Sequence, residues 1–242
     1  MKATQFEFRF RVLILGAIYF LGFWAPWERY SSAPVYTAWL MFSTSIARLH
    51  WLPLNDATLV VTVAALLLAL TGAGLRVWGT AYLGATVVHS GAMDATQIVA
   101  SGPYRYVRNP LYLGSLLFSA AISILMPATG AIFFVIASVL FYFRLMLGEE
   151  AFLAAQQGDS YLAYKQRVPR IVPGLTPRLP ASDVKPRWAQ SLLAEIYPLG
   201  MTGCFVVLAW RYNAQILIQC LIICFGVSLV TRAFVAKDTS AI

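Results

Sequence analysis

Long apolar runs are the feature that most constrains how this chain can fold. A helix needs roughly 17–25 mostly apolar residues to cross a hydrocarbon core about 30 Å thick. Five runs meet or nearly meet that length, and two shorter ones have about 16 residues. The five are 10–26, 57–78, 128–147, 190–210 and 213–235, and the shorter two are 35–50 and 111–126. With only 12% charged residues, against about 25% in soluble domains, the sequence predicts an integral membrane protein.

We expect a single integral membrane domain, 1–242, built as an all-α transmembrane bundle of about seven spans. The short run 35–50 is the doubtful span, so six spans are the alternative. Met126-Pro127 separates two runs without a further linker, which predicts a tight helical hairpin over 111–147. The last two runs predict an additional C-terminal helical hairpin over 190–235.

The basic residues indicate which side of the membrane each loop faces. Segments 76–110 and 144–187 are rich in arginine and lysine, which collect in cytoplasmic loops. We therefore expect both segments in the cytoplasm, as a cap of loops and short helices. Seven spans place Lys2, Arg9 and Arg11 outside, whereas six spans place them inside with the other basic residues. The net charge of +8 fits this topology and anionic lipid heads, not nucleic acid, because no basic stripe interleaves with aromatics.

Two adjacent carboxylates, Glu149 and Glu150, stand just past an apolar run. Neighbouring carboxylates repel each other, and the C-terminal end of a helix disfavours negative charge. The pair either marks a helix end in water or binds something positive, and the second interpretation is favoured. Gly158-Asp159-Ser160 then predicts a break, followed by a short amphipathic helix over about 160–167 that ends before Pro169.

A second cluster of polar and turn-forming residues precedes the run 111–126. It contains Gly102-Pro103, Arg105, Arg108, Asn109-Pro110 and three tyrosines. A basic-aromatic belt at the membrane interface is the alternative, but a belt does not need so many turn formers. Gly72-Ala73-Gly74 permits close approach of a helix or a ligand, and helix packing is the simpler explanation. The three cysteines lie in apolar runs without further ligands, so we expect neither a metal site nor a disulfide framework.

In this order the motifs are familiar. Gly102-Pro103-Tyr104, the stretch Arg108-Asn109-Pro110-Leu111-Tyr112-Leu113-Gly114, Glu149-Glu150, and Gly158-Asp159-Ser160-Tyr161 with Tyr164 and Val168-Pro169 resemble the isoprenylcysteine carboxyl methyltransferase family. The related phospholipid methyltransferases share the Glu-Glu pair and a Gly-x-Gly like Gly72-Ala73-Gly74. The resemblance covers about residues 70–173, which would form the catalytic core.

The resemblance implies an S-adenosylmethionine-dependent methyltransferase. Its cytoplasmic half would enclose the cofactor, and a lipid-like or small hydrophobic acceptor would enter sideways from the membrane. The family's cofactor contacts then correspond to His89, Thr96, Gln97, Ile98, Val99, Gly102, Tyr104, Asn109, Pro110, Leu111, Tyr112 and Glu149, with Gly72 and Gly74 added from the Gly-x-Gly motif. A carboxylate suits the positive charges of the cofactor, and tyrosine faces attract its sulfonium.

Three residues are candidates for the reaction itself. Arg108 would hold an anionic part of the acceptor or order the loop, and Glu150 would accept a proton from an amine. The carboxyl methyltransferases place an arginine for the acceptor carboxylate where this chain has Leu145, with Arg144 as its neighbour. The family also often has histidine where this chain has Asn109, and asparagine, unlike histidine, cannot act as a base. The acceptor is therefore open among a prenylcysteine carboxylate, a phospholipid amine and a thiol.

Two other classes of protein remain as alternatives. A membrane reductase of the sterol type would use NADPH, but those enzymes usually read His-Pro-Asn-Tyr where this chain reads Asn109-Pro110-Leu111-Tyr112. A transporter or scaffold would place charges at mid-span, whereas Arg76 and Arg144 stand near the ends of runs.

Overall fold

The computed structural model describes residues 2–30, 35–84, 87–88, 100–180, 184–211 and 214–235. Within these ranges the regular elements are helices, apart from one isolated bridge between Thr37 and Pro127, so the expected all-α class is confirmed. The elements are α1 (Gln5–Arg9), α2 (Arg11–Trp24), η1 (Pro26–Tyr30), α3 (Ala38–Arg48), α4 (Leu54–Leu83), η2 (Gly102–Arg105), α6 (Pro110–Ser123), α7 (Ala128–Arg167), α8 (Trp188–Ala194), α9 (Ile196–Arg211) and α10 (Ala214–Val235).

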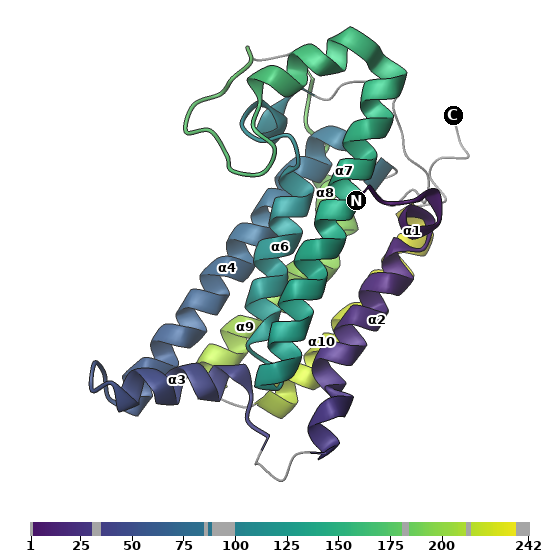
Figure 1. Ribbon diagram of the computed structural model, residues 1–242. Coiled ribbons are helices and arrows are strands. Elements are labelled where there is room, and N and C mark those ends of the chain that lie inside the picture. Colours follow the sequence, from purple (N-terminus) through teal and green to yellow (C-terminus); the bar gives the residue numbers. More distant parts are fainter. Residues whose placement is uncertain are drawn as a thin grey trace.

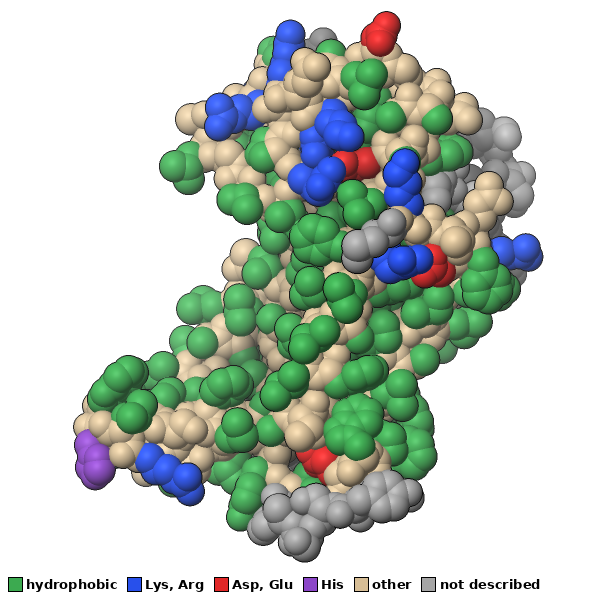
Figure 2. Space-filling model, viewed as in Figure 1, with side chains coloured by type: hydrophobic (Ala, Val, Ile, Leu, Met, Phe, Trp, Pro, Cys, Tyr) green, Lys and Arg blue, Asp and Glu red, His purple; other side chains and the backbone are tan. Residues whose placement is uncertain are grey.

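Helices α4 and α7 are long and apolar enough to cross a membrane. Figure 1 shows them side by side with α6, and α4 packs directly on α6. On α4, six large apolar side chains are 40–57% exposed, namely Leu54, Leu59, Val60, Val63, Leu67 and Leu70. Apolar side chains also cover much of the molecular face below the basic end in Figure 2. An exposed apolar surface of this extent is unfavourable in water and favourable against the hydrocarbon chains of lipids.

Helix α3 is too short for a span. Its 11 residues rise about 16 Å, roughly half the thickness of a hydrocarbon core. It lies at one end of the bundle, and backbone bonds fix it to the α6–α7 turn: the Ala38 N–H donates to Met126 O (2.8 Å) and the Trp39 N–H to Ile124 O (2.7 Å). The structure therefore does not show the expected seven spans. Figure 1 places α1 nearer the opposite end, beside the middle of α7, where the Ala3 N–H donates to Arg144 O (3.0 Å).

The polar end of the bundle is a cap, which we define as residues 100–109 and 148–180. Helix α7 continues from the bundle into the cap and is broken at Gly158, where φ is 53° and ψ is −132°. The short helical turn that follows ends at Arg167, so the predicted break and amphipathic segment are confirmed. The predicted tight hairpin is also present, because α6 ends at Ser123 and α7 begins at Ala128.

Small residues and one buried ion pair hold the bundle together near the cap. Gly72 on α4 faces Gly114 on α6 so closely that a Cβ on Gly72 would lie 2.7 Å from Gly114 O. The predicted run 190–210 is divided into α8 and α9 at Glu195, which is 1% exposed. Arg76 on α4 donates from Nε to Glu195 Oε2 (2.7 Å) and from Nη2 to Glu195 Oε1 (3.0 Å). The C-terminal helices are thus tied to α4 by a buried charge pair.

Candidate active site

The Gly-Pro-Tyr turn is formed by η2 at the start of the cap. Gly102 has φ +54°, and a Cβ there would lie 2.3 Å from the ring of Tyr82, so both conformation and space require glycine. The turn buries Tyr104, which is 7% exposed, and its backbone oxygen accepts a bond from the Tyr164 hydroxyl (2.9 Å). The turn and the distal part of α7 are therefore in direct contact.

Backbone hydrogen bonds join the two halves of the cap. The Arg108 N–H donates to Pro169 O (2.8 Å), and the Gly174 N–H donates to Tyr106 O (2.9 Å). The Arg105 guanidinium adds a bond from Nε to Leu179 O (2.8 Å). The two polar segments, distant in sequence, therefore form one unit on the same end of the bundle.

Glu150 lies at the centre of this unit and is 3% exposed. The Asn109 Nδ2 donates to Glu150 Oε1 (3.1 Å), and Arg170 donates from Nη2 to Oε2 (3.0 Å). Arg108 Nη2 lies 3.3 Å from Oε1, and Lys165 Nζ lies 4.0 Å from Oε2. Burial alone would raise the pKa of Glu150, but the hydrogen bond from Arg170, the charge of Arg108 and the Asn109 amide outweigh it and leave that pKa below its usual range.

Glu149, the neighbouring carboxylate, faces a different set of residues because successive helical positions differ by about 100°. The Tyr112 hydroxyl and the positive charge of Arg11, at the start of α2, both act to lower its pKa. Burial nevertheless raises the pKa of Glu149, with Glu150 adding to the shift. Glu149 therefore has a less positive environment than Glu150, which has three cations around it.

Two polar atoms near these carboxylates are buried without a hydrogen-bond partner among the described residues, Tyr104 Oη and Arg108 Nε. A buried hydroxyl without a partner is costly and uncommon in folded proteins. The charge of Glu149 acts on Tyr104 and raises its pKa further, after burial. The ring of Tyr112 packs edge-on against the ring of Tyr142, with centroids 6.1 Å apart, so the two rings form one aromatic surface.

The structure brings together many of the predicted site residues. Gly102, Tyr104, Asn109, Tyr112 and Glu149 gather where the cap meets the bundle. Pro110 and Leu111 begin α6 beside them. The Leu111 side chain packs so closely on Gly79 of α4 that a Cβ on Gly79 would clash with it. His89, Thr96, Gln97, Ile98 and Val99 lie outside the described residues.

Other predicted residues lie elsewhere. Arg144 pairs with Glu7 of α1, Nη2 to Oε2 at 2.8 Å, and is not part of the Glu150 cluster. Leu145, where the carboxyl methyltransferases have arginine, is 1% exposed in an apolar cluster. Gly72 packs against α6, whereas a Cβ added to Gly74 would have no atom within 4 Å.

Sequence reasoning missed several residues that shape the site. The sequence identifies Arg170 and Lys165 only as charges within the basic segment 144–187, yet both lie against Glu150. The run 190–210 is apolar enough to hide the importance of Glu195. The available signal was that a charge within such a run needs a partner, and Arg76 at the end of another run was a candidate.

Comparison with known proteins tests the family resemblance. No curated protein and no solved structure matches the chain significantly. Residues 60–160 match the model of the phospholipid methyltransferase family, and this range contains the turn, the start of α6 and both adjacent glutamates. The resemblance predicted from the motifs is therefore confirmed over residues 60–160, which are similar to the phospholipid methyltransferase family.

Proposed function

We propose that this protein transfers a methyl group from S-adenosylmethionine to an amphipathic, lipid-like acceptor at the cytoplasmic surface of a membrane. The observation that carries the proposal is the different environment of the two adjacent glutamates. Glu150 is neutralised by the protein itself, whereas Glu149 lies half-buried beside tyrosines with its pKa raised. A carboxylate left in that state is suited to a cationic ligand.

The residues fit this cofactor. S-adenosylmethionine has two positive groups, a sulfonium and an ammonium, together with a carboxylate and an adenine. Glu149 can meet a positive group, the faces of Tyr112 and Tyr104 can border the sulfonium, and the unpartnered Tyr104 hydroxyl can bond a polar edge. The match of residues 60–160 to a methyltransferase family supports the same cofactor.

The chemistry needs little from the protein besides position and charge. When bound, the cofactor supplies a methyl carbon that the acceptor's lone pair attacks, while the carbon–sulfur electron pair stays on sulfur and the acceptor's proton leaves to solvent. Glu149 and the tyrosines would hold the donor in line, and the apolar walls of α6 and α7 would exclude water. We assign proton removal to solvent, because the cations around Glu150 lower its pKa and make it a weak base.

The acceptor would approach from the lipid side of the cap. Arg108 is 7% exposed and bonds the Lys165 backbone oxygen, so we assign it to ordering the loop. Arg170 and Lys165 are more exposed, at 37% and 39%, and would be available to an anionic headgroup. Arg144 is engaged with Glu7 and is not assigned a role in acceptor binding.

The test is cofactor binding by calorimetry on the full chain in detergent or nanodiscs. Glu149→Gln should weaken binding of S-adenosylmethionine by roughly tenfold or more, the usual value of a charge-assisted contact. Asp159→Asn is the matched control, because it removes the same charge from an exposed position of the cap. Wild-type affinity in Glu149→Gln would contradict the proposed site.

The acceptor is tested separately with labelled cofactor and lipid extracts. Mass spectrometry of the products should show a methylated amphipathic lipid that is absent when Glu149→Gln replaces the wild type. Binding of the cofactor without any methylated lipid or hydrophobic thiol would refute the acceptor class while leaving the cofactor site intact.

A further inference from the structure

The N-terminal helix α1 folds onto α7 beside Glu149, although it lies outside the matched range 60–160. The Ala3 N–H donates to Arg144 O (3.0 Å), and a Cβ on Gly148 would lie 3.2 Å from Ala3 O. Phe8 is 3% exposed and belongs to the apolar cluster that contains Leu145. The start of the chain is thus seated on the turn of α7 that directly precedes Glu149.

Arg11 follows this contact at the start of α2. Its guanidinium lies over the Phe8 ring, 4.3 Å from the centroid, and Nη2 donates to Val88 O (2.9 Å). Tyr112 packs against the same apolar cluster as Phe8, and Glu149 stands one helical turn beyond Leu145 on the same face of α7. The charge of Arg11 acts on both Glu149 and Tyr112. The contacts with Phe8 and Val88 therefore help to hold Arg11 at the edge of the proposed cofactor site.

We infer that Arg11 and Glu149 form a two-charge receptor for an α-amino-acid zwitterion, in which Arg11 takes the carboxylate and Glu149 the ammonium of the cofactor's methionine end. This inference rests on the proposed function, because it names the part of the cofactor that this edge of the site binds. A guanidinium pairs with a carboxylate through two parallel hydrogen bonds, and a carboxylate is the natural partner of an ammonium. The stacking on Phe8 and the bond to Val88 fix Arg11 before the ligand arrives, which reduces the entropy lost on binding.

The pairing is tested by changing both the residue and the ligand group. The affinities of wild type and Arg11→Gln are measured by calorimetry for S-adenosylmethionine and for its decarboxylated analogue, which lacks only the carboxylate. Arg11→Gln should weaken S-adenosylmethionine binding by roughly tenfold to a hundredfold and change the affinity of the decarboxylated analogue less than about threefold. Arg11→Lys, which retains the charge without the planar fork, should give an intermediate loss.

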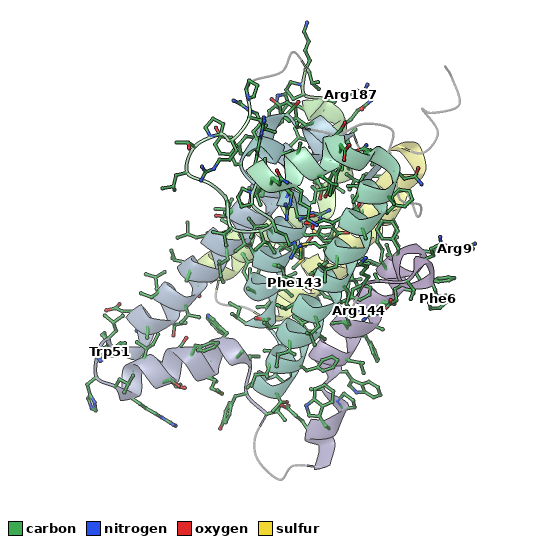
Figure 3. The ribbon with its side chains drawn as sticks, turned by 45° about the horizontal axis from the view of Figure 1, so that its top comes forward. Phe6, Arg9, Trp51, Phe143, Arg144 and Arg187 are labelled. Carbon is green, nitrogen blue, oxygen red and sulfur yellow. The ribbon has the colours of Figure 1, made fainter. Side chains whose placement is uncertain are left out.

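Arg9→Gln is the matched control, since Arg9 is exposed and points away from the bundle in Figure 3. Its affinity for both ligands should equal that of the wild type. Equal losses for both ligands in Arg11→Gln would mean that Arg11 only shapes the site, and tighter binding would mean that it competes with the cofactor for Glu149. Either outcome overturns the inference. Failure of the wild type to bind S-adenosylmethionine would refute the proposed function itself.

Discussion

The buried pair of Arg76 and Glu195 permits a quantitative prediction about the C-terminal helices. Glu195 is 1% exposed and Arg76 20% exposed, and two hydrogen bonds of 2.7 and 3.0 Å join them. The same Glu195 accepts from Thr80 Oγ1 (2.7 Å), and Arg76 also donates to Ser115 Oγ (2.7 Å). Glu195→Gln removes the negative charge and leaves Arg76 buried without a counterion.

Removing one partner of a buried ion pair typically costs about 3–5 kcal/mol, because the remaining charge stays desolvated. We expect a loss of that size for Glu195→Gln. The pair of Arg144 and Glu7 is the matched comparison, since it has the same residue types and two similar bonds but side chains that are 33% and 22% exposed. Glu7→Gln should cost about 1 kcal/mol or less, as pairs open to solvent do.

The measurement is reversible unfolding in mixed detergent micelles, followed by circular dichroism. The double variant Arg76→Met with Glu195→Leu completes a cycle, and it should recover most of the stability lost in Glu195→Gln because neither charge remains buried. Equal losses for Glu195→Gln and Glu7→Gln would refute the reasoning, and so would a double variant less stable than Glu195→Gln.

Three further results are expected. Gly72→Ala should lower the unfolding temperature in detergent, because its Cβ would lie 2.7 Å from a backbone oxygen, whereas Gly74→Ala, with no atom within 4 Å, should maintain or raise it. Tyr104→Phe should leave that temperature unchanged or higher, since its hydroxyl has no partner among the described residues, yet weaken cofactor binding in calorimetry; an unchanged affinity would remove Tyr104 from the site. The hydrogen bond from Arg144 lowers the pKa of Glu7 from 4.5 to about 2, so its stabilisation is present above pH 4.5 and is lost as the pH falls through about 2. The stability difference between wild type and Glu7→Gln should therefore shrink from about pH 6 to about pH 3, and a constant difference would contradict the pairing.

Local patterns in the sequence were sufficient for the long helices α4 and α7 and for the break in α7. Gly158 followed by Asp159 predicts a stop and a new cap, and the left-handed φ of 53° is present there. The short α3 was harder, because its run has enough apolar residues to suggest a span. The turn at Leu49–His50, where φ of His50 is 57°, ends the helix after only 11 residues.

The ion pairs could not be predicted from the sequence, because hydropathy describes each apolar run separately and does not show which runs pack together. Glu195 interrupts an apolar run, but its partner Arg76 is 119 residues away, and only the packing of α8 and α9 on α4 brings them together. Arg170 likewise pairs with Glu150 because the chain turns back after α7 and bonds the segment that precedes α6. The motifs predicted which segments meet, and the charge pairing within the cluster required the tertiary structure.

The balance of charge distinguishes the ion pairs that join helices from the charged clusters that could bind a ligand. Glu195 and Glu7 each meet one arginine through two hydrogen bonds, so the charge of each carboxylate is balanced by its partner. Around Glu150, three cations face one carboxylate, and two of those cations are more than a third exposed. An excess of positive charge beside an apolar, lipid-facing surface favours an anionic headgroup. The adjacent Glu149 adds a carboxylate with a raised pKa, which favours a cation on the bundle side of the same turn. Under the proposed function, a methyl donor with a positive sulfur would therefore bind on the Glu149 side of this helical turn, and an anionic headgroup would bind on the side of Lys165 and Arg170.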